Sequence, residues 1–305
     1  AWYIARVRLF FVALLAACAA APPPAPAAPA PTPAGPPPFL WRVEAADGPP
    51  SLLFGTLHAG LALEESLDEE VLVRLDASRA LLVELDARAV DGERMLAGAM
   101  LPPAETLDEY LPAPVWDALQ AEVAQELPPD ILVRLSPWFP MSLVVRKRLE
   151  ALRPGPPAPP MDVALIDRAR AAGVPVRPLE TLDDQLAALN SLPPDQAASE
   201  IVELYEARAT VDDELRELLA AYRSGDAARA EAATFDPEEV AARPAFYEAL
   251  FDRRNAAWMT TLRAELQEGG LFVAVGLGHL LGDQGLVSLL RAEGFAVSRY
   301  VSGSE

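Results

Sequence analysis

Short apolar runs recur along this chain, and each is followed by a residue that breaks or caps a strand. The runs at residues 51–54 and 271–275 are followed directly by glycine, and the run at residues 80–83 is followed by glutamate. Runs this short that stop at such residues are typical of buried strands. The carboxyl ends of parallel strands in an open α/β sheet form the edge where ligands bind. The pattern therefore predicts three strands that deliver polar groups to one edge.

The segment between the runs at residues 51–54 and 80–83 has the spacing of a helix. Leucine and valine recur at helical positions within residues 66–77, after Ser66, which suits the N-terminal cap. A strand, a helix and a strand in this order predict a parallel pair. Upstream, residues 39–46 and 51–54 flank an Asp-Gly-Pro-Pro turn, which predicts a hairpin.

Helical patterns dominate the remaining sequence. Helices are predicted within 91–150, 162–172, 195–266 and 285–293, strands at 174–179 and 295–301, and a loop or lid at the proline-rich residues 154–160. The fold class that follows is α/β, with a central mixed sheet, flanking helices and a large helical insert. The folded domain is predicted to span residues 39–305.

The first 38 residues have a different composition. Two arginines precede an apolar run within residues 1–21, which predicts an export signal, and the run is too short to span a membrane comfortably. The run ends in Leu-Ala-Ala-Cys18, which resembles a bacterial lipobox and predicts lipidation of Cys18; the alternative is ordinary signal-peptidase cleavage that removes this cysteine. Residues 22–38 hold ten of the chain's 31 prolines and predict an extended tether.

This arrangement predicts a lipoprotein of the cell envelope. The lipid anchor would attach it to a membrane, facing the periplasm or the cell surface, and in a Gram-negative cell to the outer membrane. The formal net charge of -20 argues against nucleic-acid binding, which needs clustered lysine and arginine. Cys18 is the single cysteine, so the chain has neither an intramolecular disulfide nor a thiolate metal site.

The two histidines share one local pattern. His58 closes Gly-Thr-Leu-His and His279 closes Gly-Leu-Gly-His, each directly after an apolar run. Glu84 follows the third run, so all three side chains are predicted at the same sheet edge. The chain has only two histidines, and both follow the same local pattern. This points to a shared site rather than to two isolated turn residues.

Several motifs together resemble the TraB/GumN family, which is related to the Tiki proteins. In chain order they are Leu40-Trp41-Arg42, Phe54-Gly55-Thr56-Leu57-His58, Val83-Glu84-Leu85-Asp86, Pro178-Leu179-Glu180-Thr181, Arg254-Asn255 with Trp258, and Val273-Ala274-Val275-Gly276-Leu277-Gly278-His279. Pro159-Pro160-Met161-Asp162 departs from the family's usual glycine, aliphatic residue and aspartate, but keeps Asp162. The resemblance implies a fold similar to the erythromycin-esterase and ChaN-like group, with both histidines and a glutamate facing one cleft.

The resemblance also implies chemistry, since Tiki proteins are described as divalent-metal-dependent proteases. Imidazole and carboxylate suit Mn, Co, Zn or Fe, so the metal ligands are predicted to be His58, Glu84 and His279. Three such ligands leave positions for water and a carbonyl group, as hydrolysis of a peptide or a small-molecule substrate requires. The site residues besides the histidines are predicted to be Glu84, Arg254 and Asn255 as catalytic groups, with Asp86 and Glu180 as secondary candidates.

Two other functions fit the same residues. In a metal-independent, esterase-like hydrolase, His58 would be the general base and Glu84 would orient it. In a non-enzymatic envelope protein, the same pocket would bind a ligand, a metal or haem without breaking a bond. Asp86, two residues after Glu84, would face the same side of a continuing strand and accept a hydrogen bond from a histidine. Glu180 has the alternative role of an acid at a helix N-terminus beside Thr181.

Overall fold

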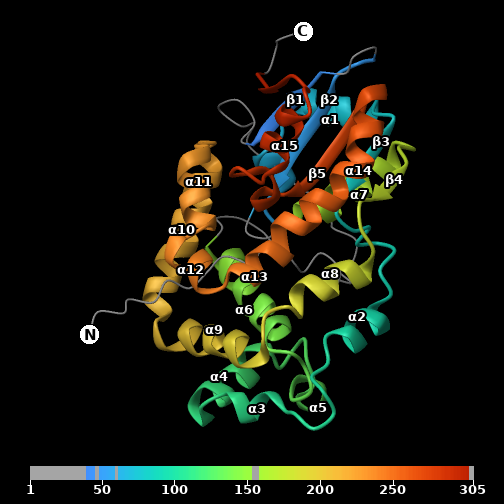
Figure 1. The fold of residues 1–305 in the computed structure, drawn as a ribbon. Coiled ribbons are helices and arrows are strands. Elements are labelled where there is room, and N and C mark those ends of the chain that lie inside the picture. Colours follow the sequence, from blue (N-terminus) through green and yellow to red (C-terminus); the bar gives the residue numbers. More distant parts are fainter. Residues whose placement is uncertain (1–38, 45–47, 59–60, 153–157, 302–305) are drawn as a thin grey trace.

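The computed structural model describes residues 39–44, 48–58, 61–152 and 158–301 (Figure 1). The predicted export signal, Cys18 and the tether lie outside the described residues, as do residues 153–157 of the predicted loop. Within the described ranges, no helix combines the length and the apolar character that crossing a bilayer requires.

Six strands of the described chain form one mixed sheet in the order β4-β3-β5-β2-β1-β6. The parallel part consists of β4 (Val176–Pro178), β3 (Ala80–Val83), β5 (Leu271–Gly276) and β2 (Ser51–Thr56). Strands β1 (Leu40–Val43) and β6 (Val297–Arg299) complete the sheet in antiparallel pairs. The α/β class with a mixed sheet is therefore confirmed, and so is the predicted hairpin of β1 and β2.

The centre of the sheet is buried on both faces. Every residue of β2, β3 and β5 is buried, which explains why their sequences are nearly continuous apolar runs rather than alternating ones. The parallel direction predicted for β2 and β3 is confirmed, but β5 lies between them. Two segments more than 200 residues apart in the sequence thus lie side by side, with Thr56 opposite Gly276.

Helix α1 (Glu69–Asp76) begins later than predicted. Ser66 follows the short 3-10 helix η3 (Leu63–Glu65), and the N-terminal cap of α1 is Asp68, whose side chain accepts a hydrogen bond from Val71 N at 3.0 Å. The prediction of Ser66 as the cap was wrong because aspartate competes for the same role two residues later.

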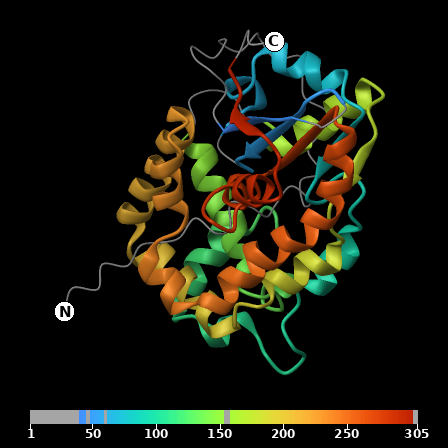
Figure 2. The same ribbon diagram turned by 45° about the horizontal axis from the view of Figure 1, so that its top comes forward.

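The helices form two groups. Helices α7, α14 and α15 lie beside the sheet, whereas α3, α4, α5 and α9 gather at the opposite end of the molecule (Figures 1 and 2). The bounds along the first half are α2 (Gly92–Gly98), α3 (Leu107–Tyr110), α4 (Ala113–Val123), α5 (Pro129–Leu132), α6 (Trp138–Ala151) and α7 (Met161–Ala171). Along the second half they are α8 (Leu182–Leu189), α9 (Pro194–Glu206), α10 (Arg208–Ser224), α11 (Ala227–Thr234), α12 (Pro237–Ala242), α13 (Pro244–Tyr247), α14 (Arg253–Glu268) and α15 (Leu286–Ala292).

Two helical segments near the site are irregular. A π-helical segment, η4 (Glu248–Asp252), joins α13 to α14, and a 3-10 turn, η5 (Leu277–Leu280), follows β5 directly. Wide π turns are rare and concentrate at functional sites. Here the π segment leads into α14, whose second residue is Arg254, and the 3-10 turn carries His279.

Candidate functional site

The three predicted side chains meet at the carboxyl edge of the parallel strands. Glu84 follows β3, His58 follows β2 and His279 follows β5, and all three are buried. His279 Nε2 lies 3.8 Å from Glu84 Oε1. The predicted convergence of these residues on one site thus matches their placement in the structure.

Gly276 is the point around which they gather. Its backbone N–H donates to Glu84 Oε1 at 2.6 Å. A methyl group placed on its α-carbon would lie 2.9 Å from His58 Nε2 and 3.1 Å from Glu84 Oε1. Contacts that short are repulsive, so only glycine lets these two side chains approach the end of β5.

Asp162 holds His58 from the first turn of α7. Its Oδ2 is hydrogen-bonded to His58 Nδ1, and its Oδ1 accepts from Thr56 Oγ1 at 2.8 Å. An ionised carboxylate only accepts hydrogen bonds, so Nδ1 carries the hydrogen, and in neutral His58 the lone pair is on Nε2. His58 Nε2 is buried and has no hydrogen-bond partner among the described residues.

The charge of Asp162 also sets the protonation of His58. Burial alone lowers the pKa of His58, but attraction and hydrogen bonding to Asp162, with a contribution from Glu84, raise the pKa above 6.5. For Asp162, burial raises the pKa, yet His58 and Thr56 outweigh it and hold the pKa below its usual value. Asp162 is therefore ionised at neutral pH, and the pKa of His58 is raised above its usual value.

Asn255 fixes the other histidine in one neutral form. Its Nδ2 donates to the carbonyl oxygens of His279 and Gln284 at 3.3 and 2.8 Å, so its Oδ1 must accept from His279 Nδ1, 2.7 Å away. The lone pair of His279 is then on Nε2, which accepts from Arg254 Nη1 at 2.9 Å. Burial, Arg254 and His58 together hold the pKa of His279 well below 6.5, so this imidazole stays neutral.

Arg254 uses all five of its N–H groups inside the site. Nε and Nη2 donate to the two oxygens of Glu180 at 2.8 and 2.7 Å, and Nη2 also donates to Glu84 Oε2 at 2.7 Å. Nη1 donates to the carbonyl of Leu250 in the π segment and to His279 Nε2, both at 2.9 Å. The guanidinium group therefore links both acids to one histidine at the centre of the cluster.

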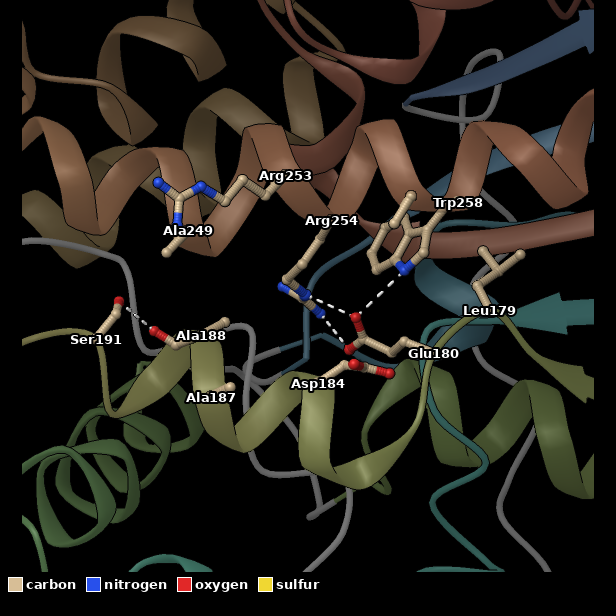
Figure 3. A pocket seen from close by; sticks show the side chains of 11 residues that line it. Leu179, Glu180, Asp184, Ala187, Ala188, Ser191, Ala249, Arg253, Arg254 and Trp258 are labelled. Atoms are coloured by element: carbon tan, nitrogen blue, oxygen red, sulfur yellow. Dashed lines mark hydrogen bonds and ion pairs between the residues drawn. The ribbon is translucent and has the colours of Figure 1, made fainter.

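A cavity of about 390 Å³ opens on the Arg254 side, between α8 and the η4–α14 helix (Figure 3). Glu180, Arg254 and Trp258 line it, and Trp258 Nε1 donates to Glu180 Oε2 at 3.2 Å. Small side chains such as Ala188 and Ala257 also line it. Neither histidine lines this cavity, so it reaches the site through Arg254 and Glu180.

Residues 39–299 match the model of the TraB/PrgY/gumN family, which covers most of the chain. The chain belongs to the TraB/PrgY/gumN family. No curated protein and no solved structure is significantly similar to the chain.

The remaining predicted residues of this TraB/PrgY/gumN protein have different positions. Glu180 lies in the site, because Thr181 and Asp184 cap α8 and leave Glu180 to face Arg254. Asp86 does not contact either histidine: β3 ends at Val83, and the Asp86 carboxylate pairs with Arg170 at 2.7 Å. The prediction that Asp86 faces the same side as Glu84 was wrong because the strand does not continue.

The predicted metal ligands are already engaged with protein groups. Both oxygens of Glu84 and Nε2 of His279 accept hydrogen bonds from Gly276 and Arg254, and only His58 Nε2 lacks a partner among the described residues. The described chain contains no group of three or more His, Cys, Asp or Glu side chains arranged to hold a metal ion. In this arrangement the donors do not fit a metal, and the predicted metal ion stays a prediction.

Asp162 is the site residue that the sequence analysis did not assign. It lies 104 positions from His58, and no periodic pattern connects the two. The signal that was available is its place in the Pro159–Asp162 segment, where the aspartate was kept although the preceding glycine was lost. The burial of a carboxylate in the first turn of α7 is explained by His58 and Thr56, which both bind it.

Proposed function

We propose that this TraB/PrgY/gumN family protein is a hydrolase of peptide or ester bonds in which His58 is the general base. The observation that carries the proposal is the buried Nε2 of His58, which has no partner among the described residues while Asp162 holds Nδ1. An unpaired buried polar atom costs about 1–3 kcal/mol, so its presence calls for a functional reason. Binding of the reacting water molecule to His58 Nε2 supplies that reason.

The proposed step needs only groups of this chain and a water molecule. His58 Nε2 takes a proton from water as the water oxygen attacks the carbonyl carbon of the substrate, and Asp162 stabilises the imidazolium that forms. The proton then passes from His58 to the leaving nitrogen or oxygen. His279 does not serve as the base, because its Nε2 lone pair already accepts from Arg254.

The other residues of the site act on charge and position. Arg254 stabilises the developing oxyanion in this buried environment once an Nη1 N–H exchanges its present acceptor, Leu250 O or His279 Nε2, for the oxyanion. Glu84 and Glu180 hold Arg254, and Asn255 acts as a positioning residue through His279. The metal-independent alternative predicted from the sequence had Glu84 orienting His58. In this proposal the carboxylate that orients His58 is Asp162.

The proposed location is the cell envelope, with a lipid anchor at Cys18. Its support is the sequence of the first 38 residues: a basic and apolar start, the lipobox-like Leu-Ala-Ala-Cys18 and the proline-rich tether. Metabolic labelling with a clickable palmitate in a bacterial host tests it directly. We expect label on the native chain and none on Cys18→Ala.

A panel of peptide and ester substrates tests the hydrolase, assayed once with a chelator and once with added Mn²⁺ or Zn²⁺. The variants are His58→Gln and Asp162→Asn, and the matched control is Arg263→Ala, which removes an exposed ion pair with Glu293. We expect turnover in the native protein and the control, and a loss of about 10²–10⁴-fold in the two site variants. Turnover that needs an added metal would favour the metal-dependent hydrolase, and binding without turnover would favour the ligand-binding protein.

A further inference from the structure

We infer that Arg254 is the resident cation of this site: it holds the donors that a divalent metal ion would need, and thereby keeps such an ion out. Metal binding at Arg254 is measured without any turnover, so its outcome does not depend on whether the protein is a hydrolase.

The first argument is the chemistry of the donors around the guanidinium group. Arg254 is bound by the carboxylates of Glu84 and Glu180, by Nε2 of His279 and by the carbonyl oxygen of Leu250. Carboxylate oxygen, neutral imidazole nitrogen and backbone carbonyl oxygen are the donor types that divalent metals take in proteins. Each of these four groups gives a lone pair to an arginine N–H instead.

The second argument is the tautomer of His279. Asn255 forces the proton onto Nδ1 and leaves the lone pair on Nε2. This is the arrangement by which an amide or carboxylate partner prepares a histidine to bind a metal. In this chain the prepared lone pair points at Arg254 Nη1, at 2.9 Å.

The third argument is charge. Two carboxylates and one guanidinium give the cluster a formal charge of -1, with His279 neutral because its Nδ1 donates to Asn255 and its Nε2 accepts from Arg254. Without the guanidinium the same donors would carry -2 in a buried position, and a divalent cation would neutralise them. Arg254 also lines the 390 Å³ cavity, so its removal opens a route from solvent to these donors (Figure 3).

Arg254→Ala should therefore create a metal site. Isothermal titration calorimetry with ZnCl₂ and with MnCl₂ would compare the native protein, Arg254→Ala, and the double variant Arg254→Ala/His279→Ala. We expect Arg254→Ala to bind one ion at least about tenfold more tightly than the native protein, and the double variant to lose that gain. Arg253→Ala is the matched control, since its guanidinium group is exposed and pairs with Glu248 at the surface; it should bind no better than the native protein.

Two results would overturn the inference. One is stoichiometric metal binding by the native protein that His279→Ala removes, because the arginine would then move aside for the ion. The other is a folded Arg254→Ala variant that binds metal no better than the native protein. If Arg254→Ala does not fold, the native protein decides: its His279 ring ¹⁵N signals should not respond to Zn²⁺, and a response would contradict the inference.

Discussion

Replacing Arg254 with alanine is also the sharpest test of how the site is held together. Arg254 is 5% exposed, and the two acids that it binds, Glu84 and Glu180, are 6% and 8% exposed. Breaking a buried ion pair by removing one partner costs about 3–5 kcal/mol, because an uncompensated charge stays behind. At about 2–4 °C per kcal/mol for a domain of this size, Tm should fall by about 6–20 °C.

Arg253 offers a control on the neighbouring position of the same helix. Its side chain is 66% exposed and its ion pair with Glu248 is at the surface. Exposed pairs of this kind contribute about 0–1 kcal/mol, so Arg253→Ala should unfold close to the native protein. Both variants would be followed by urea unfolding and by thermal circular dichroism, with a chelator present so that no metal replaces the arginine.

The pH dependence of the stability lost in Arg254→Ala gives a second, independent readout. Burial already raises the pKa of Glu180 in the native protein, although Arg254 opposes it. Without Arg254 the pKa of Glu180 in the folded state rises further above its value in the unfolded state. The variant is then most stable below the unfolded-state pKa, and it loses stability as pH rises through the folded-state pKa. The deficit should be larger at about pH 8 than at about pH 5. This reasoning would be refuted if Arg254→Ala and Arg253→Ala were equally stable, or if Arg254→Ala lost the same stability at both pH values.

Three further predictions concern the groups around Gly276. Gly276→Ala should displace His58 and Glu84, cost about 1–3 kcal/mol in unfolding free energy and abolish turnover. The control is Gly92→Ala, whose methyl group meets nothing within 4 Å and should change neither stability nor turnover. Asp162→Asn should move the acid limb of the pH-rate profile to lower pH, because it removes the attraction that raises the pKa of His58; an unmoved limb would exclude this pairing. In ¹⁵N NMR of the two histidines, His58 should titrate above pH 6.5 while His279 stays neutral with its proton on Nδ1, and a His279 that titrates near 6.5 would contradict the Asn255 contact.

The sheet edge was predictable because strand ends leave a clear mark in sequence. Apolar runs that stop at Gly55, Glu84 and Gly276 located β2, β3 and β5, and parallel strands bring their carboxyl ends together. The spatial order was not predictable from these runs. β5 lies between β2 and β3, and nothing local in three fully buried strands specifies their neighbours.

Contacts beyond the strand ends were harder to predict. Asp86 was expected to continue the alternation of β3, but the chain turns after Val83 and the carboxylate reaches Arg170 instead. The His58–Asp162 pair and the five bonds of Arg254 join segments that lie far apart in sequence, so no periodicity contains them. Helix patterns predicted that residues near 254 are helical, but not that a π turn precedes Arg254 and offers it the carbonyl of Leu250.

The most direct test of the account is the turnover of a peptide and ester panel by the native protein and by His58→Gln, each with and without a chelator. The account predicts that the native protein turns over a substrate equally well with chelator present, and that His58→Gln loses this activity. Turnover that disappears with the chelator and returns with Mn²⁺ or Zn²⁺ would contradict it, as would full activity in His58→Gln.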